Sequence, residues 1–300
     1  LGILALDDGR LVLTPFLKED SSVKSKVFDS VELGDFNQAL RCLVGAYVMG
    51  YDHIDIKSRE HISHDVRKAV RTFTDTVIGP EIVDDSLHRL SITDLSDFRK
   101  LTFDTSVRRM HLIINAMMES LEIAILKNDL KIAEEVMDRD RELNRLNWLV
   151  ARQYNKLMKD PMMTETLETT KERGLNLMLI SRIQERIGDH IDRIAYNLIE
   201  LEKPLSKKRA ADLMRALKLS HEAYEMSMKS LFNRNMALAN NAMDHVNAAV
   251  SACDDLTESL AVERGGDTLK FAYMIESTLR IARYSKDISE SVINILVDMN

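Results

Sequence analysis

Residues that interrupt helices are scarce in the last two-thirds of the chain. From Phe103 to the end, almost two hundred residues contain only two prolines and four glycines. Inside a helix, glycine costs about 1 kcal/mol and proline about 3 kcal/mol relative to alanine, so this composition favours long helices with short connections. We predict six helices, at about 104–128, 130–158, 162–202, 206–234, 237–263 and 267–298.

The segments between these helices are short, and they lie at 127–129, 159–161, 203–204 and 265–266. Short loops make consecutive helices antiparallel, which predicts helical bundles. The helix predicted over 162–202 is long enough to bend, and Gly174 or Gly188 is the expected position.

The helices look duplicated. A forward shift of 94 residues (281 − 187) aligns the helix predicted over 162–202 with the one over 267–298. It places Ile187 on Ile281 and matches further apolar positions of the two helices. Any two amphipathic helices align in this way at some offset, so the alignment alone leaves chance open. The shared order of three helices followed by three favours a tandem repeat of three-helix bundles, at 103–203 and 204–300.

The first hundred residues contain short apolar segments between turn residues. We predict strands at 27–33, 53–57, 81–83 and 87–92, and helices at 35–49 and 63–77. This β-α-β-α-β-β order predicts a small α+β domain over 21–102, with Asp35 as a helix N-cap. Upstream, two apolar segments flank Asp7-Asp8-Gly9, a hairpin signal. We assign residues 1–20 to the remnant of an upstream hairpin.

Composition excludes several classes of protein. The formal net charge of −7 argues against a general nucleic-acid binder. Cys42 and Cys253 are far apart, so we expect neither a disulfide framework nor a cysteine zinc site, and a reducing cytoplasm fits. No apolar run approaches the ~18 residues of a membrane span. The chain begins with Leu1 and has no signal-peptide pattern, so we expect that native sequence precedes it.

Three acidic residues, Glu185, Asp189 and Asp192, share one helix face opposite an apolar stripe. Like charges four residues apart repel by roughly 0.2–0.5 kcal/mol per pair. The face could hold a cation, and its oxygen donors would suit iron, magnesium, manganese or calcium. The alternative is a solvated acidic face that is paired with neighbouring arginines, namely Arg182, Arg186 and Arg193.

The segment Glu185-Arg186-Ile187-Gly188-Asp189-His190 resembles the signature of PhoU phosphate-uptake regulators. The resemblance covers 103–300 and is strongest over 135–202. It implies two tandem PhoU-like three-helix bundles, each with an E/D-x-x-x-D motif near the end of its third helix. In this chain Glu185 and Asp189 supply the motif once, and Asp140 matches the family's acidic position on the second helix. The resemblance thus implies a metal site made by these three residues.

The chain departs from the family pattern in both bundles. At the equivalent positions of the second bundle, Leu279 replaces the Glu and Arg283 replaces the Asp. Asn144 stands where relatives often have an Asp, and Tyr196 where they often have a Glu. The resemblance therefore implies that a second metal cluster is absent or remodelled, and that the first has one charged donor fewer.

A weaker resemblance covers residues 40–95. They look like the region between an AbrB-type DNA-binding domain and the PhoU bundles in archaeal fusion proteins. The stretches 46–52 and 78–83 carry this likeness. It implies that any DNA contact lies in the missing upstream segment.

The resemblance implies a non-enzymatic, cytoplasmic regulator of phosphate uptake and homeostasis that acts by protein–protein interaction. Its expected partner is a phosphate ABC transporter ATPase or a signalling protein, and it is expected to form a homodimer without membrane insertion. One alternative is a transcriptional regulator, and another is a metal-dependent carboxylate-site enzyme. Di-iron bundle enzymes use Glu-x-x-His pairs, and Glu222 with Glu225 lacks the His. No P-loop, GxSxG or HExxH motif is present.

Overall fold

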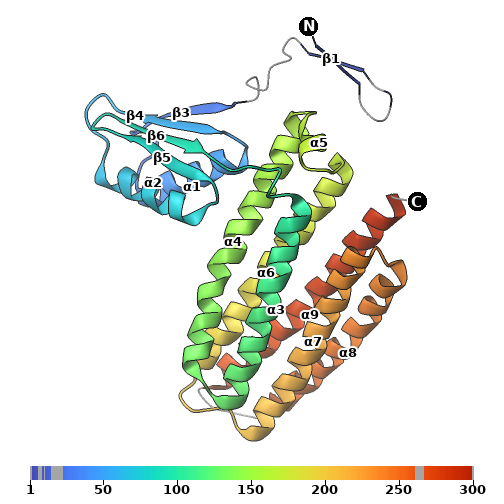
Figure 1. The fold of residues 1–300 in the computed structure, drawn as a ribbon. Helices are drawn as coiled ribbons and strands as arrows, with labels where there is room; N and C mark the ends of the chain where they lie inside the picture. Colours follow the sequence, from blue (N-terminus) through green and yellow to red (C-terminus); the bar gives the residue numbers. More distant parts are fainter. Residues whose placement is uncertain (1, 6–8, 10, 15–22, 261–266, 299–300) are drawn as a thin grey trace. The chain divides into compact units, whose positions relative to one another are not determined.

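The structure is a computed structural model that describes residues 2–5, 9, 11–14, 23–260 and 267–298. It divides into two compact units (Figure 1). The first comprises Leu1–Asp97 with Asn155–Met163, and the second comprises Phe98–Tyr154 with Thr164–Asn300. One helix, α4 (Leu130–Lys159), therefore contributes residues to both units.

The first unit contains a four-stranded sheet in the order β3-β4-β6-β5. Strand β3 is parallel to β4, and the other neighbours are antiparallel. The strands are β3 (Ser25–Asp29), β4 (His53–Lys57), β5 (Pro80–Asp85) and β6 (Arg89–Asp94). The predicted β-α-β-α-β-β order is confirmed. The first strand ends at Asp29 rather than residue 33, because a turn begins there, closed by a hydrogen bond from the Glu32 amide to the Asp29 carbonyl.

Helices α1 (Phe36–Val48) and α2 (His64–Thr76) cover one face of this sheet (Figure 1). The predicted cap at Asp35 is confirmed, because its carboxylate accepts a hydrogen bond from the Gln38 amide at 2.9 Å and completes a capping box. The apolar core lies between the helices and the strands. Its largest members include Tyr47, Phe73, Ile56, Leu90 and Ile92, all buried.

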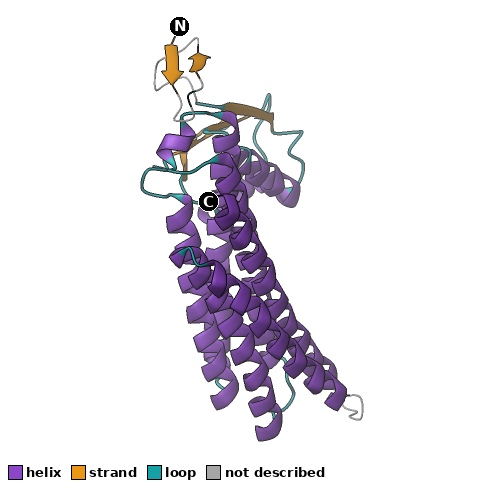
Figure 2. Cartoon of the chain, turned by 90° about the vertical axis from the view of Figure 1, so that its right-hand side faces the viewer, coloured by secondary structure: helices purple, strands orange, loops and turns teal. Residues whose placement is uncertain are grey.

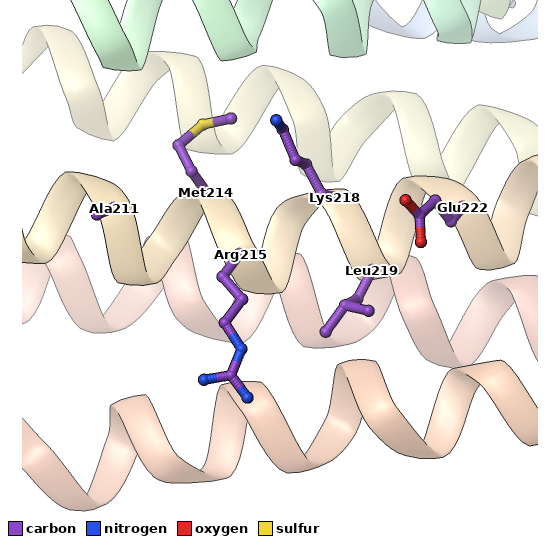
Figure 3. A pocket seen from close by; sticks show the side chains of 6 residues that line it. All are labelled: Ala211, Met214, Arg215, Lys218, Leu219 and Glu222. Atoms are coloured by element: carbon purple, nitrogen blue, oxygen red, sulfur yellow. The ribbon is translucent and has the colours of Figure 1, made fainter.

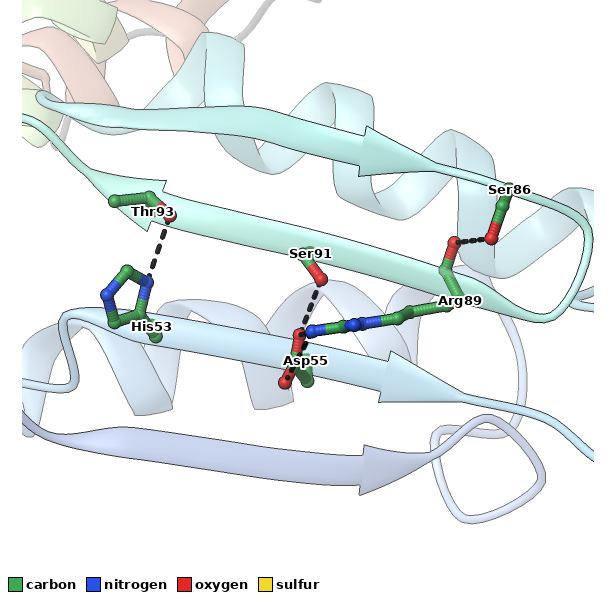
Figure 4. Close-up of polar contacts among 6 residues, drawn as sticks. All are labelled: His53, Asp55, Ser86, Arg89, Ser91 and Thr93. Carbon is green, nitrogen blue, oxygen red and sulfur yellow. Dashed lines mark hydrogen bonds and ion pairs between the residues drawn. The ribbon is translucent and has the colours of Figure 1, made fainter.

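Polar side chains occupy the opposite face of the sheet (Figure 4). Asp55 accepts hydrogen bonds from Ser91 at 2.5 Å and from Arg89 at 3.0 Å. His53 and Thr93, which are opposite each other in the register, are 2.9 Å apart through Nδ1 and Oγ1. The polar groups of neighbouring strands thus hydrogen-bond to each other, as is common on a sheet face that contacts solvent.

The end of α4 completes the first unit. The Lys156 ammonium lies 2.5 Å from the Asp52 carboxylate, and both side chains are mostly buried. The Lys159 ammonium donates a hydrogen bond to the Met49 carbonyl at 2.7 Å. The turn between α1 and β4 is thereby held by two lysines from a distant part of the sequence.

The predicted N-terminal hairpin is confirmed. Strand β1 (Gly2–Ala5) pairs antiparallel with β2 (Leu11–Thr14). The predicted turn residues Asp7 and Asp8 lie outside the described residues.

The second unit is built from long helices that lie side by side (Figure 2). They are α3 (Phe103–Lys127), α4, α6 (Lys171–Ile199), α7 (Lys207–Asn233), α8 (Met236–Leu260) and α9 (Asp267–Asp298). Helices α3, α4 and α6 form the first set of helices, and α7, α8 and α9 form the second. The two sets are in contact, because α6 packs against α9 and α3 packs against α7. No helix in the described ranges is both long and apolar enough to cross a membrane.

The prediction of one helix over 162–202 is wrong. A short helix, α5 (Met163–Thr166), is followed by a break before α6. Glu168 adopts a left-handed backbone with φ of 49°, which ends the helical path. The Thr170 hydroxyl then accepts a hydrogen bond from the Arg173 amide and caps α6. The interruption therefore precedes both glycines at which a bend was expected.

Small side chains line the contact between α7 and α9. The Ser227 hydroxyl donates a hydrogen bond to the Ser285 carbonyl at 2.8 Å and lies 2.9 Å from the Ser289 hydroxyl. The Ser220 hydroxyl lies 3.1 Å from the Thr278 carbonyl. Such contacts from side chain to neighbouring backbone require the two helices to approach closely, and small residues permit this.

Candidate functional site

The acidic residues of α6 are placed by its apolar stripe. Ile180, Ile187, Ile191 and Ile194 are all fully buried, as the period of the sequence predicts. The opposite flank carries Glu185, Asp189 and Asp192, which are at least partly exposed to solvent.

Gly188 allows α4 to approach this flank. A Cβ atom at that position would overlap the Leu143 side chain and would lie 3.3 Å from the Asp140 Oδ1 atom. The glycine therefore permits the close approach that brings Asp140 beside α6. The structure thus brings together Asp140, Glu185 and Asp189, the three acidic residues proposed as metal ligands from the sequence.

These carboxyl groups lie close enough to affect one another's protonation. Burial, followed by repulsion from Asp189, Asp192 and Glu185, raises the pKa of Asp140 to about 7. The Asn144 amide donates a hydrogen bond to the Asp140 Oδ2 atom at 2.8 Å. The Oδ1 atom is buried and has no hydrogen-bond partner within the described part of the chain. Asp140 is therefore a carboxyl that keeps its proton close to neutral pH.

Burial also raises the pKa of Glu185, Asp189 and Asp192, and repulsion from Asp189 adds to the effect at Glu185 and Asp192. The positive charge of Arg186 opposes the rise at Glu185 and Asp189. The Arg186 guanidinium lies 5.9 Å from the centre of the Tyr284 ring on α9. The arginines therefore reduce the repulsion without removing it.

The oxygen atoms of this cluster are of the type that a hard cation binds, but the side chains do not converge on one point. It offers carboxylate oxygens, including the unpaired Oδ1 atom of Asp140. In the described ranges, however, no three His, Cys, Asp or Glu side chains are arranged so that they could hold a metal ion. Binding would require these side chains to rotate towards a common point and Asp140 to lose its proton. The metal site stays a prediction.

His190 follows Asp189 in the sequence but lies toward α9. Its ring centre is 5.7 Å from that of Tyr284.

In the second set of helices, Leu279 is buried in the core, while the Arg283 side chain is exposed. The Cys253 thiol on α8 lies near the charges of Asp254, Glu276 and Arg283. A guanidinium and an apolar side chain thus stand at the positions equivalent to the two carboxylates of α6.

A polar network between α3 and α7 was missed by sequence reasoning. The Asn115 amide contacts His111 at 3.3 Å, Glu225 at 3.3 Å and His221 at 3.1 Å. Burial lowers the pKa of His111 to about 4, so its imidazole is neutral at physiological pH. The Tyr224 hydroxyl lies 3.3 Å from His111. No sequence signal could have found this network, because its two halves are far apart in the chain.

A hollow lies along α7 (Figure 3). Met214 and Lys218 point to one side of the helix axis, and Arg215 and Leu219 point to the other. All of its described lining residues come from this single helix, so no second element encloses a ligand there.

The helical part of the chain is similar to known proteins in sequence and in structure. Residues 107–198, from α3 to α6, match the family model of the PhoU domain. The crystal structure of the phosphate transport system regulatory protein PhoU from Streptococcus pneumoniae matches with a TM-score of 0.55 and 16% sequence identity. The match covers 66% of this chain and 94% of that chain. No curated protein sequence matches significantly. Residues 107–198 therefore match a PhoU domain, and the helical part of the chain shares the fold of the Streptococcus pneumoniae protein.

Proposed function

We propose that this protein regulates phosphate uptake and phosphate homeostasis by binding a partner protein. The observation that carries the proposal is the PhoU-domain match over residues 107–198. The fold shared with a phosphate transport regulatory protein supports it. In this proposal the protein is not an enzyme, and the long helical faces of the second unit provide the binding surfaces.

The proposed partner is the ATPase of a phosphate transporter or a signalling protein that controls its synthesis. Both would be met on the cytoplasmic side of the membrane, where we propose that the protein acts, as a homodimer. The exposed apolar side chains of α3, Leu112 and Leu126, are 67% and 63% exposed and offer one helical face for such contacts.

Affinity capture tests this function. The full chain, bearing a tag, is recovered from phosphate-replete and phosphate-starved cells, and the co-purifying proteins are identified. We expect a component of phosphate uptake in the phosphate-replete sample. A double Leu112→Glu and Leu126→Glu variant that keeps its helical content should lose the partner if α3 is the contact. Recovery of no phosphate-uptake component in either condition would overturn the proposal.

We further propose that Asp140, Glu185 and Asp189 hold a divalent or trivalent cation of the iron, magnesium, manganese or calcium class. Such an ion would neutralise the mutual repulsion of these carboxylates and hold α4 to α6. Elemental analysis of the purified protein, beside Asp189→Ala and an Asp138→Ala control, tests this. The control should keep the wild-type metal content. Equal content in the wild type and Asp189→Ala, or none in either, would remove the metal proposal.

Transcriptional regulation is a second candidate, favoured by the β1–β2 hairpin that precedes the sheet. It predicts that a protein with its upstream segment shifts promoter DNA, whereas residues 1–300 do not. A shift by residues 1–300 alone would contradict the assignment of DNA contacts to the upstream segment.

A further inference from the structure

The first unit contains a pocket at the carboxyl ends of its two parallel strands. It has a volume of about 410 Å³. Its lining residues at and after the end of β3 are Asp29, Ser30, Val31 and Gly34, and those after β4 are Ser58, Arg59, Glu60, His61 and Ser63. In sheets with parallel strands, ligands bind beyond the carboxyl ends of the strands, where neighbouring loops diverge. The pocket volume lies within the range of small-molecule sites, roughly 300–1,000 Å³.

Ser30 supplies a hydroxyl group that makes no hydrogen bond with a described residue. Its amide donates a hydrogen bond to the Lys57 carbonyl at 2.8 Å, which fixes the residue between the two strand ends. Ser30 is only 9% exposed and lines the pocket, and its hydroxyl makes no hydrogen bond within the described ranges. The hydroxyl lies at the pocket surface without a partner among the described residues, so it is available to hydrogen-bond a ligand.

The loop after β4 contributes a positively charged side chain to the pocket. Arg59 lines it and has no ion pair with any described residue. Ser63, also a lining residue, caps α2, a helix of 13 residues. The first amides of a helix lack partners within it and carry partial positive charge, which favours an anion. Asp65 in the first turn of α2 opposes this partial charge, and the Ser63 hydroxyl already accepts a hydrogen bond from the Val66 amide, so Arg59 is the main group on this side that suits a phosphoryl group.

Hydrogen-bond acceptors lie in the same pocket. Asp29 and Glu60 are lining residues, and a carboxylate can only accept hydrogen bonds. Such groups suit the hydroxyl donors of a ligand and disfavour a second anion. None of the described lining residues is Phe, Tyr or Trp, and the only ring among them is the imidazole of His61.

We propose that this pocket binds a small phosphate monoester that carries free hydroxyl groups, of the sugar-phosphate class. Its phosphoryl group meets Arg59 and the start of α2, and its hydroxyl groups meet Ser30, Asp29 and Glu60. The PhoU-domain match begins at residue 107, so it does not account for this part of the chain. The proposal is independent of partner binding by the helical unit, and either can fail without the other.

Calorimetric titration of the full chain tests the proposal, with ribose 5-phosphate as the probe and inorganic phosphate and ribose as comparisons. We expect saturable binding of ribose 5-phosphate, at least tenfold weaker binding of phosphate, and none of ribose. Amide chemical shifts should change in residues 29–34 and 58–64.

Two variants locate the site, and one controls for charge. Arg59→Gln should weaken binding by roughly 10-fold or more, since a hydrogen bond to a charged group is worth about 1.5–3 kcal/mol. Ser30→Ala should weaken it by roughly threefold or more. Arg41→Gln makes the same change on the exposed side of α1 and should bind like the wild type. The proposal is overturned if ribose 5-phosphate does not saturate, if phosphate binds as tightly, or if either pocket variant retains wild-type affinity.

Discussion

Replacing Asp140 by asparagine should make the metal-free protein more stable at neutral pH. The wild-type carboxyl is held near Glu185, Asp189 and Asp192, and its pKa is about 7 against an ordinary value of 3.8. A carboxyl with a raised pKa favours folding while it is protonated. That contribution is complete below pH ~4 and is lost as the pH rises through about 7. Asparagine has nearly the same shape but never acquires the charge.

The size of the effect follows from the two pKa values. One pKa unit corresponds to about 1.4 kcal/mol, so a difference of about three corresponds to about 4 kcal/mol. Asp140 is partly exposed, and solvent screens its interactions. We therefore expect a gain of about 2 kcal/mol in the free energy of unfolding for Asp140→Asn at pH 8.

Urea unfolding of the chelator-treated protein, followed by circular dichroism at several pH values, measures this difference. The gain should shrink to less than about 1 kcal/mol near pH 4.5, where wild-type Asp140 is protonated in the folded chain. Asp138→Asn, an exposed site on the same helix, controls for the loss of one charge. A destabilised Asp140→Asn protein, or a gain that does not vary with pH, would refute the reasoning.

Three further substitutions test the packing. Gly188→Ala should destabilise the helical unit by about 1–3 kcal/mol, measured by urea unfolding, because the added methyl group overlaps Leu143. An unchanged midpoint of urea unfolding would show that the contact between α4 and α6 tolerates the methyl group. Ser227→Val should cost about 2 kcal/mol by removing a buried hydrogen bond to α9 and widening the contact, with Ser227→Ala costing less. Lys156→Met should cost about 1–3 kcal/mol by removing one charged partner of the mostly buried Asp52, with faster amide exchange around the α1–β4 turn as the local readout.

Much of the fold was predictable because helices and strands follow local periodicity. The scarcity of glycine and proline predicted the long helices. The break at Glu168 was missed, because glutamate is not a residue that usually adopts positive φ. Thr169-Thr170 before Lys171 was the available signal, since threonine is a common N-cap. The sheet order β3-β4-β6-β5 depends on long-range pairing and had no local signal.

The candidate site was predictable only in part. The spacing of Glu185 and Asp189 placed both on one helix face, and resemblance to a family added Asp140. The raised pKa of Asp140 depends on how closely α4 approaches α6 at Gly188, which is a property of packing between helices. The pocket beside Ser30 had no sequence signal, because its two loops meet only when β3 and β4 pair.

Helix α4 has a consequence for how the chain can be divided. Residues 155–163 belong to the same unit as residues 1–97, although part of the other unit lies between them in the sequence. A cut after Asp97 would remove Lys156 from Asp52 and Lys159 from the turn that it holds. The sheet domain is therefore not a module that can be transferred as one continuous segment. Gene fusion or deletion at residue 97 would separate residues 155–163 from the rest of their unit.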